Sequence, residues 1–376
     1  MTEPFGVYVH VPFCAARCDY CAFATYTDRD HLMVRYVDAC VAELGAAARR
    51  GELPAATTVF VGGGTPSRLA PDELGRLLEA VPRRAGAEVT VECNPEDADE
   101  RRFAVYRAAG VTRLSFGIQS TRRHVLDSLG RRPVADAARR CAELAAAGFA
   151  SFNMDLIFGA AAETDDDWAG VLADVLGLET PPPHVSAYAL TVEPGTPLAA
   201  APDRHPDDDT SARRYEMADA ALAAAGYRWE EVSNWARPGH ECRHNQLYWS
   251  GGDYLGVGSA AHSHRDGRRW WNVRTPERYV AAVEEGRAAV AAEEVLTPDE
   301  RRFERLVLSL RTPAGVPDAS LPDHPELAGL VERRHGRAVL TVRGRLLANE
   351  LSTRLVPTAP DIPRRGRRGR PVSCAP

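Results

Sequence analysis

Residues 8–21 read YVHVPFCAARCDYC, and this stretch spaces Cys14, Cys18 and Cys21 as C-x3-C-x2-C directly after an apolar run typical of a β-strand. Three thiolates so close together in a loop indicate a metal site. A [4Fe–4S] cluster needs four ligands, so three cysteines hold it and leave one iron open. An open metal position is typical of a reactive site rather than a structural one. The spacing therefore predicts a [4Fe–4S] cluster at these three cysteines.

Two other uses of the cysteines have less support. His10 or His31 would complete a Cys3His zinc site, but only one C-x2-C pair is present. A disulfide scaffold is disfavoured because eight cysteines in 376 residues are few for a stapled secreted protein, and the N-terminus shows no basic, apolar leader. We therefore expect a cytoplasmic protein. Four other cysteines are scattered along the chain without the spacing of metal ligands, namely Cys40, Cys93, Cys141 and Cys374.

The composition excludes several classes of function. With 44% hydrophobic and 26% charged residues, the chain can bury a large core and add a smaller module. It contains no apolar run of roughly 18 residues that would cross a bilayer. The net charge of −6 argues against nucleic acid as the main partner. All 46 basic residues are arginine, and the absence of lysine excludes P-loop and pyridoxal enzymes.

Short β-rich runs alternate with alanine- and arginine-rich segments of helical periodicity. This alternation predicts a parallel sheet with crossover helices, and six units indicate an α/β fold with a partial (β/α)6 barrel. Residues 1–230 are assigned to this barrel and residues 231–296 to a post-barrel segment. The expected strands are Gly6–Val11, Thr57–Val61, Glu88–Glu92, Arg113–Ile118, Ser151–Ile157 and His184–Leu190, and the expected helices include Val34–Arg50, Asp72–Val81, Val134–Ala147 and Trp168–Leu178.

The unusual motifs follow the expected strands, at the end where the βα-loops of such a fold meet. The glycines of Gly62-Gly-Gly-Thr-Pro66 let backbone N–H groups approach a ligand. A tight turn is the plainer interpretation of these glycines, and a loop cap is the plainer one of a buried acid such as Asp155. The next three strands lead into Glu92-Cys-Asn-Pro95, Gly117-Ile-Gln-Ser120 and Asn153-Met-Asp-Leu-Ile-Phe-Gly159.

In this order, YxHxPFC, GGGTP, ExNP, GxQS and NxDLIxG resemble the motifs of the oxygen-independent coproporphyrinogen III oxidase-like radical S-adenosylmethionine (SAM) proteins, to about Pro357. The resemblance implies that the amino and carboxylate groups of SAM bind the open iron and that an electron from the cluster cleaves SAM to methionine and a 5′-deoxyadenosyl radical. Glu92 and Arg131 carry the charges suited to those two groups of SAM. The implied SAM contacts are Tyr8, Tyr20, Gly63, Gly64, Thr65, Glu92, Gln119, Arg131, Asp155, Ala189 and the Ala261-His262 segment.

Two departures separate this chain from the oxidases. The oxidases carry a fourth cysteine two positions after the third, where this chain has Phe23. They also begin with an extension that helps form the active site, whereas this chain starts seven residues before Tyr8. Both features resemble the HemW haem chaperones. The resemblance therefore implies haem as cargo, acceptor haemoproteins as partners, with membrane-associated respiratory proteins as candidates, and an electron donor for the cluster.

A histidine motif follows the barrel. His244-Asn-Gln-Leu-Tyr-Trp249 matches the H-N-x-x-Y-W signature associated with haem handling in the HemW group. Imidazole is a common axial ligand of haem iron, so His244 is the candidate haem residue. Cys242 is a second possible ligand, although no C-x-x-C-H attachment site is present. The plainer interpretation is a surface histidine beside core aromatic residues.

The C-terminal composition differs from that of the barrel. Thr297-Pro-Asp-Glu300 predicts a capped helix start, and the helix is expected to reach about Leu310. With a second helix near Glu326–Arg334, residues 297–357 have the outline of a winged-helix-like module, for which we expect packing or partner docking. Residues 358–376 are expected to form a disordered basic tail.

Three functions remain open from the sequence alone. A haem chaperone with a cluster and SAM is favoured by Phe23, the short N-terminus and the His244 motif. The alternatives are an oxidase that decarboxylates coproporphyrinogen III and a radical SAM methyltransferase of the same outline.

Overall fold

A computed structural model describes residues 3–134, 136–321 and 327–354. The chain divides into two compact units. One comprises the chain to Leu296 except for residues 249–251, and the other comprises those three residues and the chain from Thr297. Each unit is described by itself.

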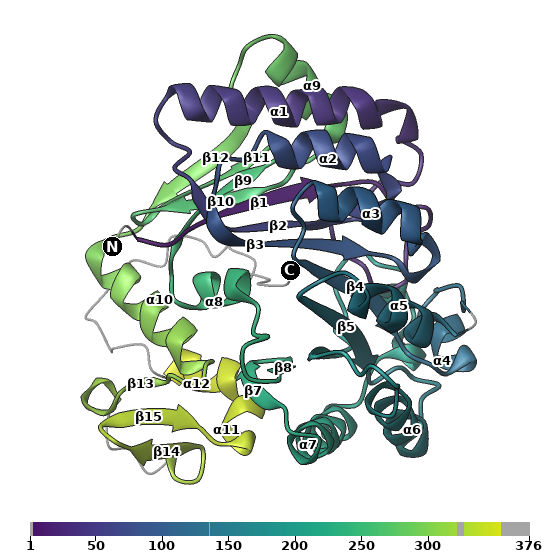
Figure 1. Ribbon diagram of the computed structural model, residues 1–376. Coiled ribbons are helices and arrows are strands. Elements are labelled where there is room, and N and C mark those ends of the chain that lie inside the picture. Colours follow the sequence, from purple (N-terminus) through teal and green to yellow (C-terminus); the bar gives the residue numbers. More distant parts are fainter. Residues whose placement is uncertain (1–2, 135, 322–326, 355–376) are drawn as a thin grey trace. The chain divides into compact units, whose positions relative to one another are not determined.

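The first unit is built on one large sheet whose centre is parallel (Figure 1). Six strands follow one another in sequence order across the sheet, and every neighbouring pair is parallel. This arrangement confirms the predicted partial (β/α)6 architecture. The six strands are β1 (Phe5–Val11), β2 (Ala56–Gly63), β3 (Arg83–Cys93), β4 (Arg113–Gln119), β5 (Ser151–Phe158) and β6 (His184–Ala189).

The central strands are buried on both faces, which explains their nearly continuous apolar sequences. In β1, Val7, Val9 and Val11 are fully buried. Crossover helices cover the outer face, where Figure 1 shows α1, α2 and α3 side by side. The helices of this layer are α1 (Met33–Arg49), α2 (Pro71–Glu79), α3 (Glu100–Ala108), α4 (Arg123–Ser128), α5 (Ala137–Ala146), α6 (Asp165–Leu176) and α7 (Asp208–Ala224).

Residues 228–296 extend both edges of the same sheet. One pair of strands adds antiparallel to β6, and a second group begins with a strand parallel to β1. The full sheet therefore has twelve strands in the order β12-β11-β10-β9-β1-β2-β3-β4-β5-β6-β8-β7. The added elements are β7 (Arg228–Glu231), β8 (Asn234–Ala236), α8 (Arg243–Trp249), β9 (Asp253–Val257), β10 (His262–Arg265), β11 (Arg268–Asn272), α9 (Pro276–Glu284) and β12 (Val290–Val295).

The second unit combines short helices with a three-stranded sheet. Its first helix begins at the predicted capping box, in which Thr297 accepts from the Glu300 N–H and Glu300 accepts from the Thr297 N–H. Buried leucines, among them Leu310 and Leu340, form its core. The elements are α10 (Pro298–Leu310), β13 (Val316–Pro317), β14 (Val331–Arg334), β15 (Arg337–Leu340), α11 (Val342–Leu346) and α12 (Ala348–Arg354), and the sheet order is β13-β15-β14.

The prediction of a helix near residues 326–334 is wrong for the part that the structure describes, because residues 331–334 form strand β14. The reason is a tight hairpin to β15, in which His335 and Gly336 both have positive φ angles, 51° and 71°. Two consecutive residues with positive φ favour a two-residue β-hairpin turn. The basic tail predicted at residues 358–376 lies outside the described residues.

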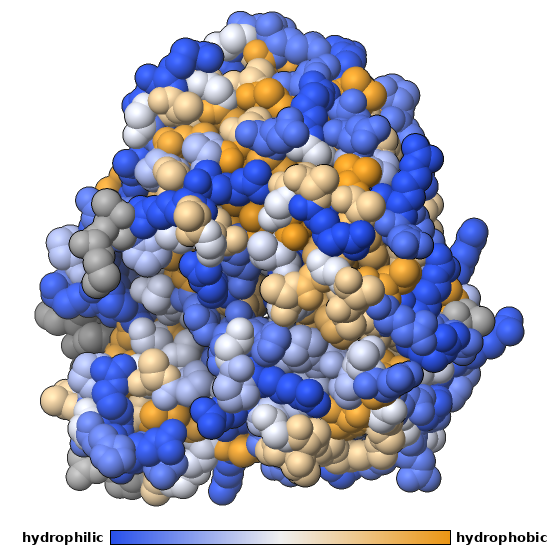
Figure 2. Space-filling view, in the orientation of Figure 1, coloured by the Kyte–Doolittle hydropathy of each residue, from blue (hydrophilic) through white to orange (hydrophobic). Residues whose placement is uncertain are grey.

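Polar side chains cover most of the face seen in Figure 2, and apolar ones appear between them in small groups. Within the described ranges, no helix combines the length and the apolarity needed to cross a bilayer.

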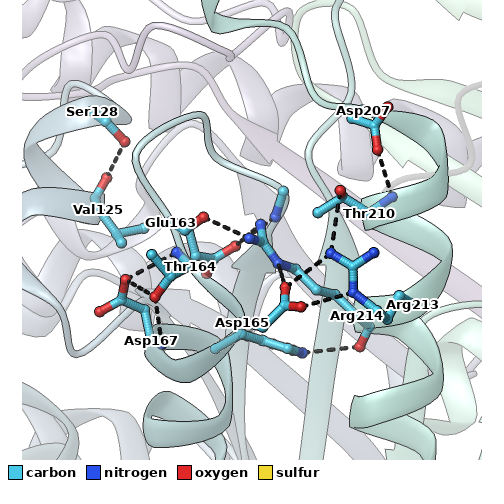
Figure 3. Close-up of polar contacts among 12 residues, drawn as sticks. Val125, Ser128, Glu163, Thr164, Asp165, Asp167, Asp207, Thr210, Arg213 and Arg214 are labelled. Atoms are coloured by element: carbon cyan, nitrogen blue, oxygen red, sulfur yellow. Dashed lines mark hydrogen bonds and ion pairs between the residues drawn. The ribbon is translucent and has the colours of Figure 1, made fainter.

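A buried ion pair attaches the loop after β5 to α7 (Figure 3). Arg214 Nη1 donates to Glu163 Oε2 at 2.8 Å, and the two side chains are 5% and 0% exposed. The N–H of Gly159, with φ of 94°, donates to the same Glu163 oxygen at 2.7 Å. Asp165 accepts from both Arg213 and Arg214 at the protein surface. The pair therefore fixes the loop that follows the strand carrying Asp155.

We expect Arg214→Ala to lower the free energy of unfolding by about 3–5 kcal/mol, because it leaves the Glu163 carboxylate buried without its cation. The matched control is Arg213→Ala, whose side chain is half exposed and should change stability by less than about 0.5 kcal/mol. Urea denaturation followed by circular dichroism measures both. Equal effects of the two substitutions would contradict this account.

Candidate functional site

The three motif cysteines lie on the loop that leaves β1 at the C-terminal edge of the parallel sheet. All three are free thiols and are partly exposed. The N–H of Cys21 donates to the carbonyl of Cys18 at 3.2 Å, and the N–H of Cys14 donates to the carbonyl of Tyr26 at 3.0 Å. Backbone hydrogen bonds therefore hold the loop that carries the three cysteines in a compact turn.

Two polar side chains from other strands reach the sulfur atoms. Thr65, after β2, donates to Cys14 Sγ at 3.5 Å, and Arg131, after α4, donates to Cys18 Sγ at 3.8 Å. Asn94, after β3, links the two donors, because it lies 3.4 Å from Thr65 Oγ1 and 3.4 Å from Arg131 Nη2. The sequence analysis quoted Asn94 only as part of the ExNP motif and gave it no role.

The chemistry of the three cysteines fits an iron–sulfur cluster, whose iron ions supply positive charge. Burial, with smaller contributions from the neighbouring Cys21 and Cys18, raises the pKa of Cys14 to about 11. Three thiolates in such a place need strong positive charge, which iron supplies. In the described part of the chain, no three His, Cys, Asp or Glu side chains are positioned to share a metal ion.

His10 is not available to complete a zinc site. Its Nε2 donates to the carbonyl of Ala24 at 3.1 Å, and its Nδ1 lies 3.2 Å from the Tyr8 hydroxyl. Burial lowers the pKa of His10 to about 4, so the ring is neutral and both of its nitrogens are occupied. In this arrangement the His10 ring supports the cysteine loop through its hydrogen bond to the Ala24 carbonyl.

The glycine turn after β2 packs directly on the cysteine loop. A Cβ at Gly64 would lie 2.8 Å from the carbonyl oxygen of Phe13 and 3.0 Å from Cys14 Sγ. The N–H of Gly63, which has φ of 111°, donates to Glu92 Oε2 at 3.1 Å. Only glycine allows this approach, so the GGG motif connects the cysteine loop with the acid at the end of β3.

Glu92 and Asp155 form a pair of partly buried acids beside this turn. Burial, together with the nearby charge of Asp155, raises the pKa of Glu92 to about 8. The Tyr8 hydroxyl lies in the same environment, because burial and Glu92 both raise the pKa of Tyr8. A buried acid with so few hydrogen bonds is typical of a site that a cationic or hydroxyl-bearing ligand completes.

Gln119 is strained and incompletely bonded at the end of β4. Its φ is 65°, in the left-handed region that favours glycine, and its side chain is 9% exposed. Among the described residues, its Oε1 atom is buried without a hydrogen-bond partner. Backbone strain and an unsatisfied buried amide together are typical of a ligand-binding position.

The remaining predicted SAM contacts lie around the same edge. Arg131 Nη2 donates to the Gly117 carbonyl at 2.9 Å, and its charge acts on Tyr20. Ala189 is exposed at the end of β6. His262, on β10, is exposed and stacks on Trp271 with ring centroids 5.5 Å apart.

Beneath Asp155 lies a polar network that the sequence analysis missed. The Asn153 amide donates to Asp155 Oδ1 at 2.7 Å and to Ser186 Oγ at 2.9 Å. Its oxygen therefore faces His184 Nδ1, 2.6 Å away, and His184 Nε2 lies 2.9 Å from Glu230 Oε2. Burial lowers the pKa of His184 and raises that of Glu230, so burial disfavours the charged form of both groups. No motif signals Glu230, because it lies on β7, far from Asp155 in sequence.

His244, the candidate haem residue, is buried rather than accessible. The side chain is 1% exposed, Nδ1 lies 2.9 Å from Thr58 Oγ1, and Nε2 lies 2.8 Å from the Tyr248 hydroxyl. The backbone N–H of His244 donates to Glu88 Oε1 at 3.1 Å, which satisfies the start of α8. Its ring stacks on Phe60. In this arrangement neither ring nitrogen is free for a haem iron, and ligation would require α8 to leave its place.

Comparison with known proteins identifies the family. The chain is 44% identical over 366 residues to heme chaperone HemW of Mycobacterium tuberculosis, across 92% of this chain and 93% of that protein. This chain belongs to the HemW family. The HemW proteins of Escherichia coli and Bacillus subtilis are 38% and 31% identical to it, across 69% and 92% of this chain and 70% and 97% of their own lengths.

Two further comparisons agree with this HemW assignment. Residues 8–175 match the model of the radical SAM superfamily, which implies a [4Fe–4S] cluster and SAM as cofactors. Coproporphyrinogen III oxidase HemN from Escherichia coli is similar in structure, with a TM-score of 0.81 and 24% identity across 94% of this chain and 90% of that one. This similarity confirms the radical SAM fold that the motifs predicted for this HemW-family chain.

The burial of His244 is open to direct test. Diethyl pyrocarbonate acylates accessible neutral imidazoles, so we expect His262 to react rapidly and His244 to remain protected until the protein unfolds. Peptide mass spectrometry over a time course measures both sites, and a His262→Asn variant should lose only the fast reaction. Reaction of His244 as fast as that of His262 would show that α8 opens readily.

Proposed function

We propose that this chain is a haem chaperone that binds a [4Fe–4S] cluster and SAM and delivers haem to acceptor haemoproteins. The observation that carries the proposal is its 44% identity to a heme chaperone HemW along almost the whole length of both proteins. Haem is the cargo, and the partners are acceptor haemoproteins, including membrane-associated respiratory proteins, together with an electron donor for the cluster.

In this proposal Cys14, Cys18 and Cys21 hold the cluster, which when bound supplies an electron to SAM. Arg131, which already donates to Cys18 Sγ, binds the SAM carboxylate. Glu92 accepts from the SAM amino group, a contact that would favour the ionised carboxylate that burial now disfavours.

The other residues shape and orient the SAM site. Gly63, Gly64 and Thr65 form its floor, since their turn already contacts both Glu92 and Cys14. Gln119 has an unsatisfied amide oxygen for a ligand donor, and Asp155 is held by its polar network. The walls of this SAM site are completed by four further residues, Tyr8, Tyr20, Ala189 and His262.

The second candidate function is oxygen-independent decarboxylation of coproporphyrinogen III, which the structural similarity to the oxidase HemN favours. Phe23 weighs against it. This side chain stands where the oxidases carry a fourth cysteine, and it is 37% exposed on the cysteine loop.

The SAM site gives one expected result. A charge-assisted contact contributes about 1.5–3 kcal/mol, so Glu92→Gln should weaken SAM binding roughly tenfold or more while iron content stays near four per chain after anaerobic reconstitution. Calorimetry and iron analysis measure the two quantities. Cys18→Ala is the opposite control, because it should lose the cluster. Unchanged SAM affinity in Glu92→Gln would contradict the assignment of this residue.

The decisive test of function compares haem transfer with oxidation. We expect the reconstituted wild type to bind haem and pass it to an apo-haemoprotein, and to form no protoporphyrinogen from coproporphyrinogen III with reductant and SAM. Absorbance spectra follow the transfer, and chromatography with carbon dioxide detection follows the decarboxylation. Robust decarboxylation of coproporphyrinogen III by a protein that binds no haem would contradict the chaperone proposal and support the oxidase function instead.

A further inference from the structure

Two consecutive acids on β7, Glu230 and Glu231, both join the buried polar network beneath Asp155. They are 6% and 3% exposed, although neighbouring residues of a regular strand face opposite sides of the sheet. The pairing of β7 with β8 shifts in register between Trp229 and Glu231, and a bulge of this kind re-aims a side chain. The irregularity therefore lets two adjacent carboxyl groups enter one network.

Glu231 sets the direction of hydrogen bonding at one end of the network. Its Oε1 accepts from the Asn234 amide nitrogen, and its Oε2 accepts from the Ser233 N–H at 3.4 Å. The Asn234 oxygen therefore faces Ser186, whose hydroxyl donates to it at 2.7 Å. With its hydrogen committed in this way, the Ser186 oxygen acts as an acceptor for the Asn153 amide, 2.9 Å away.

This direction determines which nitrogen of His184 carries a hydrogen. The NH2 group of Asn153 donates to Ser186 and, at 2.7 Å, to Asp155 Oδ1, so the Asn153 oxygen faces the ring. His184 Nδ1 lies 2.6 Å from that oxygen and must donate to it. In a neutral imidazole the other nitrogen, Nε2, is then an acceptor.

Glu230 is the group that faces this acceptor, with its Oε2 2.9 Å from Nε2. A carboxyl group donates a hydrogen bond when it is protonated. Burial raises the pKa of Glu230 to about 8 despite the opposing charge of Arg113. The other groups that act on this carboxyl are the Cys242 N–H, Glu241 and Glu88. The protonated form of Glu230 therefore prevails near pH 7 and supplies the donor that the ring needs.

The His184 ring is held in its neutral form by the same surroundings. Burial and the charge of Arg113 lower the pKa of His184 well below its usual range. Asp155 and Glu241 act in the opposite direction, and His240 adds a smaller lowering effect. An imidazolium is thus disfavoured, which leaves the tautomer with its hydrogen on Nδ1.

We propose that Glu230 and His184 are positioning residues of the SAM site. Neutral Glu230 donates to His184 Nε2, and the resulting Nδ1–H tautomer keeps the NH2 group of Asn153 on Asp155. In the other tautomer Nδ1 would accept, and the Asn153 amide would turn its oxygen toward the Asp155 carboxylate, where two acceptors would repel. This inference rests on the SAM site of the proposed function and names residues that act on it without contacting SAM.

The benefit of this arrangement falls on Asp155. Burial raises the pKa of Asp155, and the hydrogen bonds from Ser186, Asn153 and Ser115 oppose that rise. Asn153 donates to Oδ1, and Ser115 donates to Oδ2 at 3.2 Å. Hydrogen bonds to a carboxylate favour its ionised form. The network therefore keeps Asp155 ionised and oriented for a ligand that is cationic or bears hydroxyl groups.

The test is calorimetric titration of the cluster-loaded full chain with SAM. Glu230→Ala should weaken SAM binding about tenfold, because Nε2 loses its donor. Glu230→Gln should bind SAM like the wild type, because its amide N–H donates as the neutral carboxyl does. The same change at the neighbouring acid, Glu231→Gln, should weaken binding about threefold or more, because that residue acts as an acceptor. Equal losses in Glu230→Gln and Glu230→Ala would overturn the donor role of Glu230.

Nitrogen NMR spectroscopy of the chain with isotope-labelled histidine reads the tautomer directly. The His184 signals are identified by their loss in His184→Asn. The wild type and Glu230→Gln should both show a neutral ring protonated at Nδ1, whereas Glu230→Ala should shift toward the Nε2–H tautomer. A wild-type ring that is protonated at Nε2 alone, or at both nitrogens, would overturn the proposal.

A control variant separates positioning from general loss of stability. Leu172 on α6 is 3% exposed and lies outside the network, so Leu172→Ala should lower the melting temperature and leave SAM affinity unchanged. Circular dichroism and iron content verify that each variant is folded and loaded. If the wild type binds no SAM, the proposed SAM site fails and this inference with it. If the wild type binds SAM and Glu230→Ala binds it equally well, the inference alone is overturned.

Discussion

The close approach of two loops at the C-terminal edge of the sheet is the constraint on which the rest of the site depends. Parallel pairing of β1 and β2 aligns Val11 with Gly63, so the cysteine loop and the glycine turn leave the sheet side by side. Gly64 then lies so near the loop that a Cβ would meet two carbonyl oxygens and Cys14 Sγ. Because this contact has no room for a side chain, the position of the cysteine loop is tied to the register of two strands.

A second constraint is electrostatic. The first unit buries several acids inside its sheet, and burial disfavours their ionised forms. Glu92 and Asp155 lie near one another beside the glycine turn, whereas Glu230 contacts His184 deeper in the sheet. Asn153 connects the two regions, since it contacts both Asp155 and His184. The orientation of Asp155 therefore depends on residues from β5, β6 and β7 together.

The histidine motif shows how a functional signature and a structural role can coincide. His244 fills the space between β2 and α8, with Thr58 and Tyr248 on its two nitrogens and Glu88 on its backbone. Removing it would leave several buried polar groups without partners, so a loss of haem handling in a His244 variant would not by itself identify a ligand.

The sequence by itself determined the elements that local pattern encodes. Apolar β-rich runs and helical periodicity located the six central strands and most crossover helices within a few residues, and the cysteine spacing located the proposed cluster loop. Periodicity failed at residues 327–334, where a positive-φ hairpin at His335 and Gly336 overrides a helical pattern. Only the tertiary structure decided the burial of His244 and the contact between Glu230 and His184. The physical reason is that burial, hydrogen-bond partners and pKa shifts depend on residues that are distant in sequence and meet only when the sheet is assembled.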